Sequence, residues 1–261
     1  MDWPTILATF AAGGLIGFVL GLVGGGGSIL AVPLLIYLVG VDSTHIAIGT
    51  AAVAVAVNAA FGFLTHARKG NVKWACAGVF ALAAVLGAAL GAELGKAMDG
   101  ARLLALFALL MVGVGLNTMR KRKTARDADV RLDRSTAGTL LPKLIPTGFG
   151  VGGFSGFFGI GGGFLIVPGL TAATAMPISI AIGSSLLVVA AVGATTAISY
   201  SISGLVNWEL VSVLFAGGIV GALTGNRLLL SLSDKSRLLE LGFGALVIAV
   251  GTAILIGEYA L

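Results

Sequence analysis

The stretch of sequence that decides the fold covers residues 21–33 and reads Gly-Leu-Val-Gly-Gly-Gly-Gly-Ser-Ile-Leu-Ala-Val-Pro. The pattern returns at residues 156–168 as Gly-Phe-Phe-Gly-Ile-Gly-Gly-Gly-Phe-Leu-Ile-Val-Pro, a shift of 135 residues (156 − 21). Both copies place several glycines inside a segment that is apolar enough for a bilayer. Paired glycine breaks in hydrophobic segments are typical of the binding site of a transporter with two internal repeats. The sequence therefore predicts a membrane transporter.

The composition excludes an ordinary soluble protein. The chain has 261 residues, of which 57% are hydrophobic and only 10% are charged, and its mean hydropathy is +1.07. These values are typical of a polytopic membrane protein. The basic residues lie in loops between apolar runs, so the net charge of +5 does not indicate nucleic-acid binding. A single cysteine, Cys76, excludes an internal disulfide and a cysteine-built metal site, and we expect no cofactor and no metal.

Ten apolar runs follow one another along the chain. They cover residues 4–23, 28–40, 44–65, 74–95, 101–119, 141–158, 164–175, 177–200, 208–230 and 238–258. A full span needs about 20 residues, so the second run of each half is a short or tilted helix, or the return limb of a re-entrant hairpin. The expected fold is an all-α polytopic membrane protein with two inverted repeats. Each repeat has a glycine-broken hairpin and three full spans, giving 8–10 helical segments in all.

The repeat extends over almost the whole chain. Ile46-Ala47-Ile48-Gly49-Thr50 returns as Ile180-Ala181-Ile182-Gly183-Ser184, a shift of 134 (180 − 46), and glycines spaced by four match between the halves. Such glycines let two helices pack closely. The expected units are the first repeat, the basic linker and the second repeat, at residues 1–119, 120–140 and 141–261.

Basic residues set the expected orientation, because lysine and arginine concentrate in cytoplasmic loops. With 66–73, the linker with Lys143 and the 227–237 turn inside, only Lys96 and Arg102 of the 16 basic residues remain outside. This placement requires an odd number of crossings in each half. It predicts inverted repeats in the plasma (inner) membrane, a cytoplasmic linker at 120–140, and both termini outside.

The glycine stretches are the candidate anion site. Helices expected to start near Ser28 and Phe164 expose their first N–H groups, where the helix dipole is positive. The glycines have no side chains to keep a ligand from those groups, and inverted topology brings the two turns toward one another. Two positive helix ends at one cavity bind an anion without any charged side chain. The alternative is that the glycines only form tight turns that let helices pack.

Hydroxyl and amide side chains would complete this site. Thr50 and Ser184 are the best candidates because they occupy equivalent positions of the two repeats. Further candidates are Ser155, Thr195, Thr196, Ser199 and Tyr200. The alternative is that membrane Ser and Thr side chains only bond carbonyls of their own or a neighbouring helix. The predicted substrate-binding residues are Gly24, Gly25, Gly26, Gly27, Ser28, Thr50, Asn58, Gly159, Gly161, Gly162, Gly163, Ser184 and Ser185.

Ionisable groups are scarce in the apolar runs, and no catalytic constellation is present. Glu93 lies close to the end of a run, and His45 and His66 lie at predicted helix ends, where a histidine is usually unrelated to transport. Proton-coupled carriers usually place an acid or a histidine at mid-membrane, so proton coupling is only weakly indicated. The chain has no HExxH, GxSxG or P-loop motif. We therefore expect no enzymatic activity.

The duplicated glycine stretches ending in Val-Pro, at 24–33 and 159–168, resemble those of the TauE/SafE family of sulfite exporters. The Ala-Ile-Gly-Thr/Ser step at 47–50 and 181–184 strengthens the resemblance, which covers nearly the full length. The resemblance implies a small anionic substrate, a sulfur oxyanion or a sulfonate. The first copy reads Gly-Gly-Gly-Gly-Ser where the second reads Gly-Ile-Gly-Gly-Gly, so the half-sites need not bind identically.

The predicted function is export of a small anion, sulfite or an organosulfonate, by alternating access around the paired broken helices. One alternative is a passive anion channel. Another is a membrane partner protein that does not transport, with the basic linker as its docking surface. The expected partners are the substrate anion and the lipid bilayer, with no nucleic acid and with a homo-oligomer left open. The sequence also leaves open the anion, the direction and the coupling ion.

Overall fold

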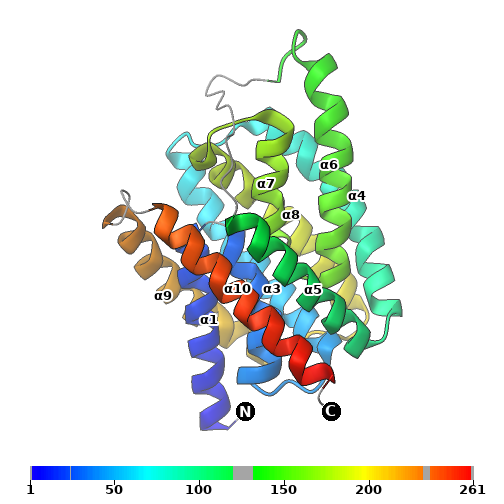
Figure 1. Ribbon diagram of the computed structural model, residues 1–261, viewed down its shortest axis with the longest axis vertical. Helices are drawn as coiled ribbons and strands as arrows, with labels where there is room; N and C mark the ends of the chain where they lie inside the picture. Colours follow the sequence, from blue (N-terminus) through cyan, green and yellow to red (C-terminus); the bar gives the residue numbers. More distant parts are fainter. Residues whose placement is uncertain (1, 24, 120–131, 232–235, 260–261) are drawn as a thin grey trace.

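The computed structural model describes residues 2–23, 25–119, 132–231 and 236–259, and all regular elements within these ranges are helices (Figure 1). In chain order they form α1 (Trp3–Val23), the 3-10 helix η1 (Gly25–Leu30), α2 (Ala31–Pro33), the π-helix η2 (Leu34–Leu38), α3 (Thr44–Arg68), α4 (Trp74–Ala97), α5 (Gly100–Met119), α6 (Ala137–Phe158), α7 (Gly163–Thr174), α8 (Ile178–Ile202), α9 (Trp208–Ser231) and α10 (Ser236–Tyr259). The predicted all-helical fold is confirmed for the described residues.

Six of the described helices are long and apolar enough to cross a bilayer, namely α1, α3, α4, α5, α8 and α9. Their outer surface has the character that lipid requires. On α4, Leu82, Leu86, Leu90 and Leu94 recur every fourth residue and are 72, 65, 59 and 65% exposed. A continuous leucine face would be unfavourable in water. Six such helices and this exposed leucine face are typical of a multi-pass membrane protein.

A second face of α4 is built from glycine and packs directly on the backbone of α6. A Cβ atom added at Gly87, Gly91 or Gly95 would collide with the α6 backbone, and one added at Gly152 or Gly156 would collide with the α4 backbone. Only glycine permits this approach. The leucine face and the glycine face together fix the rotation of α4 between lipid and protein.

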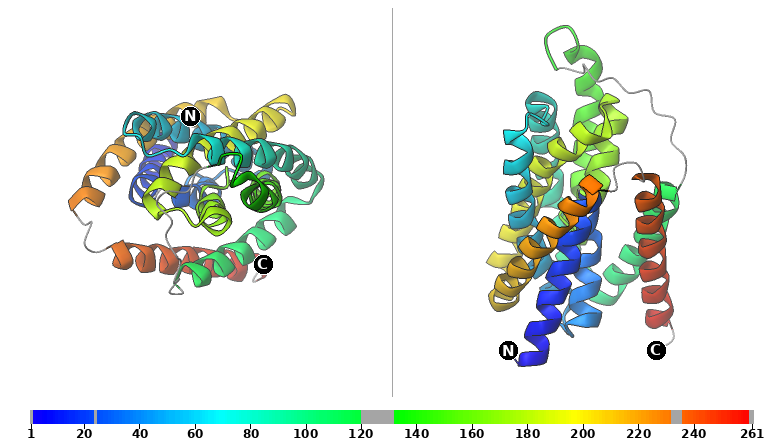
Figure 2. Two further views of the ribbon diagram at one scale, coloured as in Figure 1. Left: turned by 90° about the horizontal axis from the view of Figure 1, so that it is seen from above. Right: turned by 90° about the vertical axis from the view of Figure 1, so that its left-hand side faces the viewer.

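The same contact is made a second time between α1 and α9. A Cβ atom added at Gly13 or Gly17 would meet the α9 backbone, and one added at Gly221 or Gly225 would meet the α1 backbone. The helices of the two halves are thereby interleaved, since α1 packs on α9, α4 on α6, α3 on α8 and α5 on α10 (Figure 2). Each of these pairs takes one helix from each half of the chain.

The first glycine stretch forms a less regular element than its copy. The sequence predicts a helix beginning near Ser28, whereas η1 starts at Gly25 and contains Ser28. Glycine has a low helix propensity, and Pro33 lacks the N–H that an α-helix needs. The bonding then shifts register: the Val39 N–H donates to the Leu34 carbonyl at 3.0 Å across η2. The second copy runs as a regular helix from Gly163 through Pro168.

The described ends of the chain lie together. The start of α1 and the end of α10 are at one end of the molecule, which we call the terminal end, and α6 begins at the opposite end (Figure 1). α6 begins at Ala137, so the described helix includes the last residues of the predicted linker. The greater part of the linker, at 120–131, lies outside the described residues.

Candidate functional site

The second glycine turn lies where α3 and α8 pack on each other. Gly159, Gly161 and Gly162 have φ angles of +65°, +60° and +66°, which side-chain-bearing residues rarely adopt. A Cβ atom added at Gly161 would lie 2.8 Å from Cγ1 of Val55 on α3 and 3.7 Å from Cγ1 of Val189 on α8. This turn therefore has no room for a side chain beside the long central helices.

The turn leads directly into the positive end of α7. The Gly162 carbonyl accepts hydrogen bonds from the N–H groups of Leu165 and Ile166, both at 2.9 Å. Within the described part of the chain, no acceptor takes a hydrogen bond from the N–H groups of Gly161 and Gly162. Peptide donors at the start of a helix make a favourable place for an anion.

The first glycine stretch reaches the same region. η1 packs against α7 and also contacts α3 and α8. Gly27 is held against α1, because an added Cβ atom would lie 2.5 Å from the Ile16 carbonyl oxygen and from the Leu20 nitrogen. Ser28 is fully buried, whereas Gly24 lies outside the described residues. The structure thus places η1 and α7, the two elements that contain the glycine stretches, against each other.

Most buried hydroxyl groups near this region bond their own helices. The hydroxyls of Ser155, Ser185 and Thr196 donate to the carbonyls of residues 151, 182 and 192 at 2.7, 2.8 and 3.1 Å. These bonds follow the alternative that the sequence analysis kept open for membrane serines and threonines. Each hydroxyl oxygen still has lone pairs, but its proton is engaged within the protein.

Thr50 and Ser184 act differently, because each accepts a hydrogen bond from the other half of the chain. The Asn207 N–H donates to Thr50 Oγ1 at 3.0 Å, and the Lys73 N–H donates to Ser184 Oγ at 3.0 Å. These N–H groups immediately precede α9 and α4, where helix ends lack intrahelical acceptors. The two hydroxyls therefore hold the starts of α9 and α4 in place.

These two contacts lie at opposite ends of the antiparallel α3–α8 pair. Gly49, next to Thr50, packs on Tyr200, with an added Cβ atom 2.9 Å from the tyrosine Cβ. Gly183, next to Ser184, packs in the same way on His66, at 3.3 Å. We call these the Thr50 junction and the Ser184 junction. The glycine turn beside Val55 and Val189 lies between them along the two helices.

Asn58 contributes the amide that the sequence analysis singled out. It is 7% exposed on α3, and a Cβ atom added at Gly218 of α9 would lie 2.5 Å from its Nδ2 and 3.0 Å from its Oδ1. The amide is thus pressed against the α9 backbone. The residue at the equivalent position of the second repeat is Val192, so the two halves are not equally polar here.

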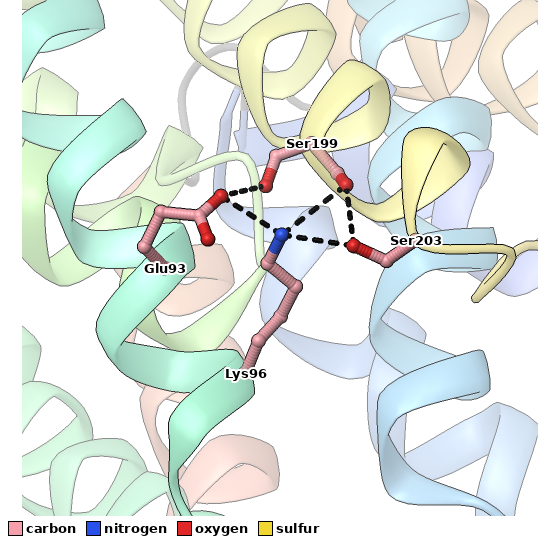
Figure 3. Close-up of polar contacts among 4 residues, drawn as sticks. All are labelled: Glu93, Lys96, Ser199 and Ser203. Carbon is pink, nitrogen blue, oxygen red and sulfur yellow. Dashed lines mark hydrogen bonds and ion pairs between the residues drawn. The ribbon is translucent and has the colours of Figure 1, made fainter.

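A polar cluster joins the last turn of α4 to the last turn of α8 at the terminal end (Figure 3). Lys96 Nζ lies 2.8 Å from Glu93 Oε1 and donates to the Ser199 carbonyl at 3.3 Å and to Ser203 Oγ at 3.0 Å. The Ser199 hydroxyl donates to the same Glu93 oxygen at 2.8 Å. A cation at a helix C-terminus is electrostatically favourable. The Lys96 cluster, comprising these four residues, therefore fastens α8 to α4.

The equivalent positions at the other end do not contain the same chemistry. They are occupied by Arg227, Leu230, Thr65 and Lys69. Two cations and no acid cannot form the acid–base pair of the Lys96 cluster. The residue types of the Lys96 cluster are therefore not repeated at the equivalent positions of the sequence. The cluster could not be predicted, because its parts are remote in sequence.

Three buried side-chain polar atoms among the described residues have no hydrogen-bond partner: Nδ1 of His45, Nδ1 of His66 and Oη of Tyr200. Most buried polar atoms in proteins are paired, so each requires an explanation. The described residues contain no group of three or more His, Cys, Asp or Glu side chains placed to hold a metal ion.

Comparison with known proteins places the chain among transporters. The family model for sulfite exporter TauE/SafE matches residues 9–254. A probable membrane transporter protein of Xylella fastidiosa (strain Temecula1) is 49% identical over 260 residues, covering 100% of this chain and 98% of that protein. The probable membrane transporter protein YunE of Bacillus subtilis is 27% identical over 242 residues, covering 86% and 88%. No solved structure matches the chain.

Proposed function

Because the chain belongs to the TauE/SafE sulfite exporter family, we propose that it carries a small anion, a sulfur oxyanion or a sulfonate, out across the plasma membrane. The family and the named relatives are membrane transporters rather than enzymes. The observation that best supports the proposal is the meeting of η1 with α7 beside the α3–α8 pair. Broken helices inside a membrane protein are tolerated around a cavity or within protein.

The proposed substrate is an anion because the site offers donors without an acid. The positive end of α7 and the N–H groups of Gly161 and Gly162 provide these donors. The proposed substrate-binding set remains that of the sequence analysis, with both glycine stretches, Ser28, Thr50, Asn58, Ser184 and Ser185. In the present conformation Thr50 and Ser184 are engaged with the starts of α9 and α4, so they would reach substrate only when these junctions move.

We propose that the two halves are inverted repeats that rock against each other. The interleaved pairing of α1 with α9 and of α4 with α6 supports this, since equivalent glycines make equivalent contacts. The shared terminal end, with α6 starting opposite to it, is consistent with a cytoplasmic linker and external termini. The Lys96 cluster then closes the external end in this conformation.

Close packing at the centre favours a carrier over a passive channel. Val55, Val189 and the fully buried Ile29 and Ile160 are apolar residues of the central region, and Gly161 has no space for a Cβ atom beside the two valines. A channel needs a continuous aqueous path, whereas alternating access needs only transient opening of one end. A role as a partner protein without transport is not favoured by any of these contacts.

Flux in proteoliposomes tests the proposal. The protein is reconstituted, sulfite, sulfoacetate, thiosulfate, sulfate and acetate are supplied separately, and saturation is recorded. We expect saturable flux for a sulfur anion in the wild type and its loss in Gly161→Leu. The control is Gly150→Leu, because Gly150 has no atom within 4 Å of an added Cβ. Flux that does not saturate would indicate a channel, and a folded Gly161→Leu variant with normal flux would contradict the proposed site.

A further inference from the structure

Tyr200 is an unusual buried side chain because its hydroxyl is unused. It is 0% exposed, and Oη has no hydrogen-bond partner. An unpaired buried polar group is destabilising, and a phenylalanine would fill the same space without that penalty. Lys96 Nζ, held in the Lys96 cluster, lies 5.9 Å from the centre of the Tyr200 ring. The ring therefore lies near a cation, while its hydroxyl has no hydrogen-bond partner.

His66 occupies the equivalent position of the first repeat, a shift of 134 (200 − 66). Its Nδ1 atom is also buried and unpaired. The surroundings match as well: the Tyr200 carbonyl accepts from the Leu205 N–H at 2.9 Å, and the His66 carbonyl accepts from the Asn71 N–H at 3.2 Å. Two chemically different side chains thus present an unused polar atom at equivalent places.

Each of these side chains belongs to one of the two junctions. Tyr200 packs on Gly49 at the Thr50 junction, and His66 packs on Gly183 at the Ser184 junction. The junctions lie at opposite ends of the α3–α8 pair. Each contains one hydroxyl that holds a helix start, at Thr50 or Ser184, and one polar atom of an aromatic side chain that has no hydrogen-bond partner. The recurrence of this combination at both ends argues against an accident of packing.

We propose that Tyr200 and His66 are two entry sites for the transported anion, one at each end of the protein. The Tyr200 hydroxyl and a protonated nitrogen of the His66 ring would each donate a hydrogen bond to a substrate oxygen when the local junction opens. Lys96 would add positive charge at the Tyr200 site alone. The ligand class is an oxyanion with a sulfur centre, and this choice rests on the proposed function.

Sulfite uptake into right-side-out and inside-out membrane vesicles tests the proposal, because each preparation exposes a different end. Tyr200→Phe should raise the half-saturating sulfite concentration about tenfold or more at the terminal end, as expected when a hydrogen bond to a charged ligand is lost. The opposite end should change little. His66→Phe should show the reverse pattern. Neither variant should melt at a lower temperature without sulfite, since neither unpaired atom bonds the protein.

Two variants serve as controls. Tyr37→Phe makes the same chemical change at a tyrosine that is 56% exposed and belongs to η2, outside the residues that define the two junctions. His45→Phe removes another unpaired Nδ1, in the first turn of α3. Tyr37→Phe should leave the half-saturating concentration at the terminal end unchanged, and His45→Phe should leave that at the opposite end unchanged. If His45→Phe reproduces the His66→Phe result there, the equivalence argument is overturned.

Failure of the inference is separable from failure of the proposed function. A wild type that takes up sulfite, together with Tyr200→Phe and His66→Phe variants that match it at both ends, overturns the entry sites and leaves the transporter intact. A lower melting temperature in Tyr200→Phe without sulfite also overturns them, because the hydroxyl would then be structural. A wild type that moves neither sulfite nor sulfoacetate overturns both.

Discussion

Substitution of Gly161 by alanine tests how the second glycine turn is held. Two effects combine at this position. The φ angle of +60° is unfavourable for any residue with a Cβ atom, and the new atom would lie 2.8 Å from Val55 Cγ1. Gly204 isolates the first effect, because its φ is +70° and nothing lies within 4 Å of an added Cβ. Gly150 on α6 is the control without either effect, because it has a helical conformation and no atom lies within 4 Å of an added Cβ.

The magnitudes of the three substitutions should differ in a fixed order. The left-handed conformation costs about 1–2 kcal/mol for an L-residue, and overpacking a well-filled site adds about 1–3 kcal/mol. Gly161→Ala should therefore lower the free energy of unfolding by about 2–5 kcal/mol, and Gly204→Ala by about 1–2 kcal/mol. Gly150→Ala should be neutral or stabilising by about 0.5–1 kcal/mol.

The assay is reversible unfolding in detergent, followed by tryptophan fluorescence, with sulfite flux measured on the same preparations. Val55→Ala removes the obstructing methyl group, so the double variant Gly161→Ala/Val55→Ala should be more stable than the sum of the single effects by about 0.5–3 kcal/mol. If Gly161→Ala is no more destabilising than Gly204→Ala, or if Val55→Ala gives no rescue, then the turn is not held by contact with α3, and the reasoning is refuted.

Three further predictions concern the contacts between segments. Thr50→Val and Ser184→Ala should each lower the free energy of unfolding by about 1 kcal/mol, because each removes the acceptor of the N–H group just before α9 or α4. Thr195→Val is the control, because the Thr195 hydroxyl bonds its own helix, and an equal loss there would contradict the role of Thr50 and Ser184 in holding these helix starts. Lys96→Met should weaken the contact between α4 and α8 and so increase thiol labelling of cysteines introduced at the terminal end. Unchanged labelling would show that the Lys96 cluster does not close the terminal end. Hydrogen bonds from residues 135 and 136 lower the pKa of the Asp133 carboxyl below its ordinary value of 3.8. The ionised carboxylate therefore stabilises the start of α6 fully at neutral pH. This stabilisation is lost as the pH falls from 3.8 toward and through the lowered pKa. The protection factors of the amides of residues 137–140, which correct for the intrinsic pH dependence of hydrogen exchange, should therefore fall on acidification in the wild type and show no such fall in Asp133→Asn.

The helices were predictable because their signals are local. Runs of apolar residues, separated by glycine or charge, give the bounds of α3, α4, α8 and α9 to within a few residues. The detailed form of the first glycine stretch was not predictable in this way. Its 3-10 and π segments depend on how Gly27 packs on α1 and on where Pro33 interrupts the hydrogen bonding, and these contacts involve a helix elsewhere in the chain.

The candidate site also has features that the local sequence predicts and features that depend on distant contacts. The glycine stretches and the equivalence of Thr50 with Ser184 could be identified because a duplicated sequence reveals positions that share a structural role. That these hydroxyls hold the starts of α9 and α4 could not, because each bond joins residues more than a hundred positions apart. The lack of a partner for Tyr200 Oη is likewise a property of its surroundings, not of its sequence neighbours.

The sequence alone thus predicted an all-helical membrane protein with a duplicated sequence and paired glycine breaks, because apolar runs and repeats are properties of the order of residues. Only the tertiary structure decided which helices pair across the two halves, which hydroxyls are engaged, and which polar atoms remain unpaired. The physical reason is that backbone contacts at glycine and hydrogen bonds between distant segments depend on distances in space, which the order of residues does not specify.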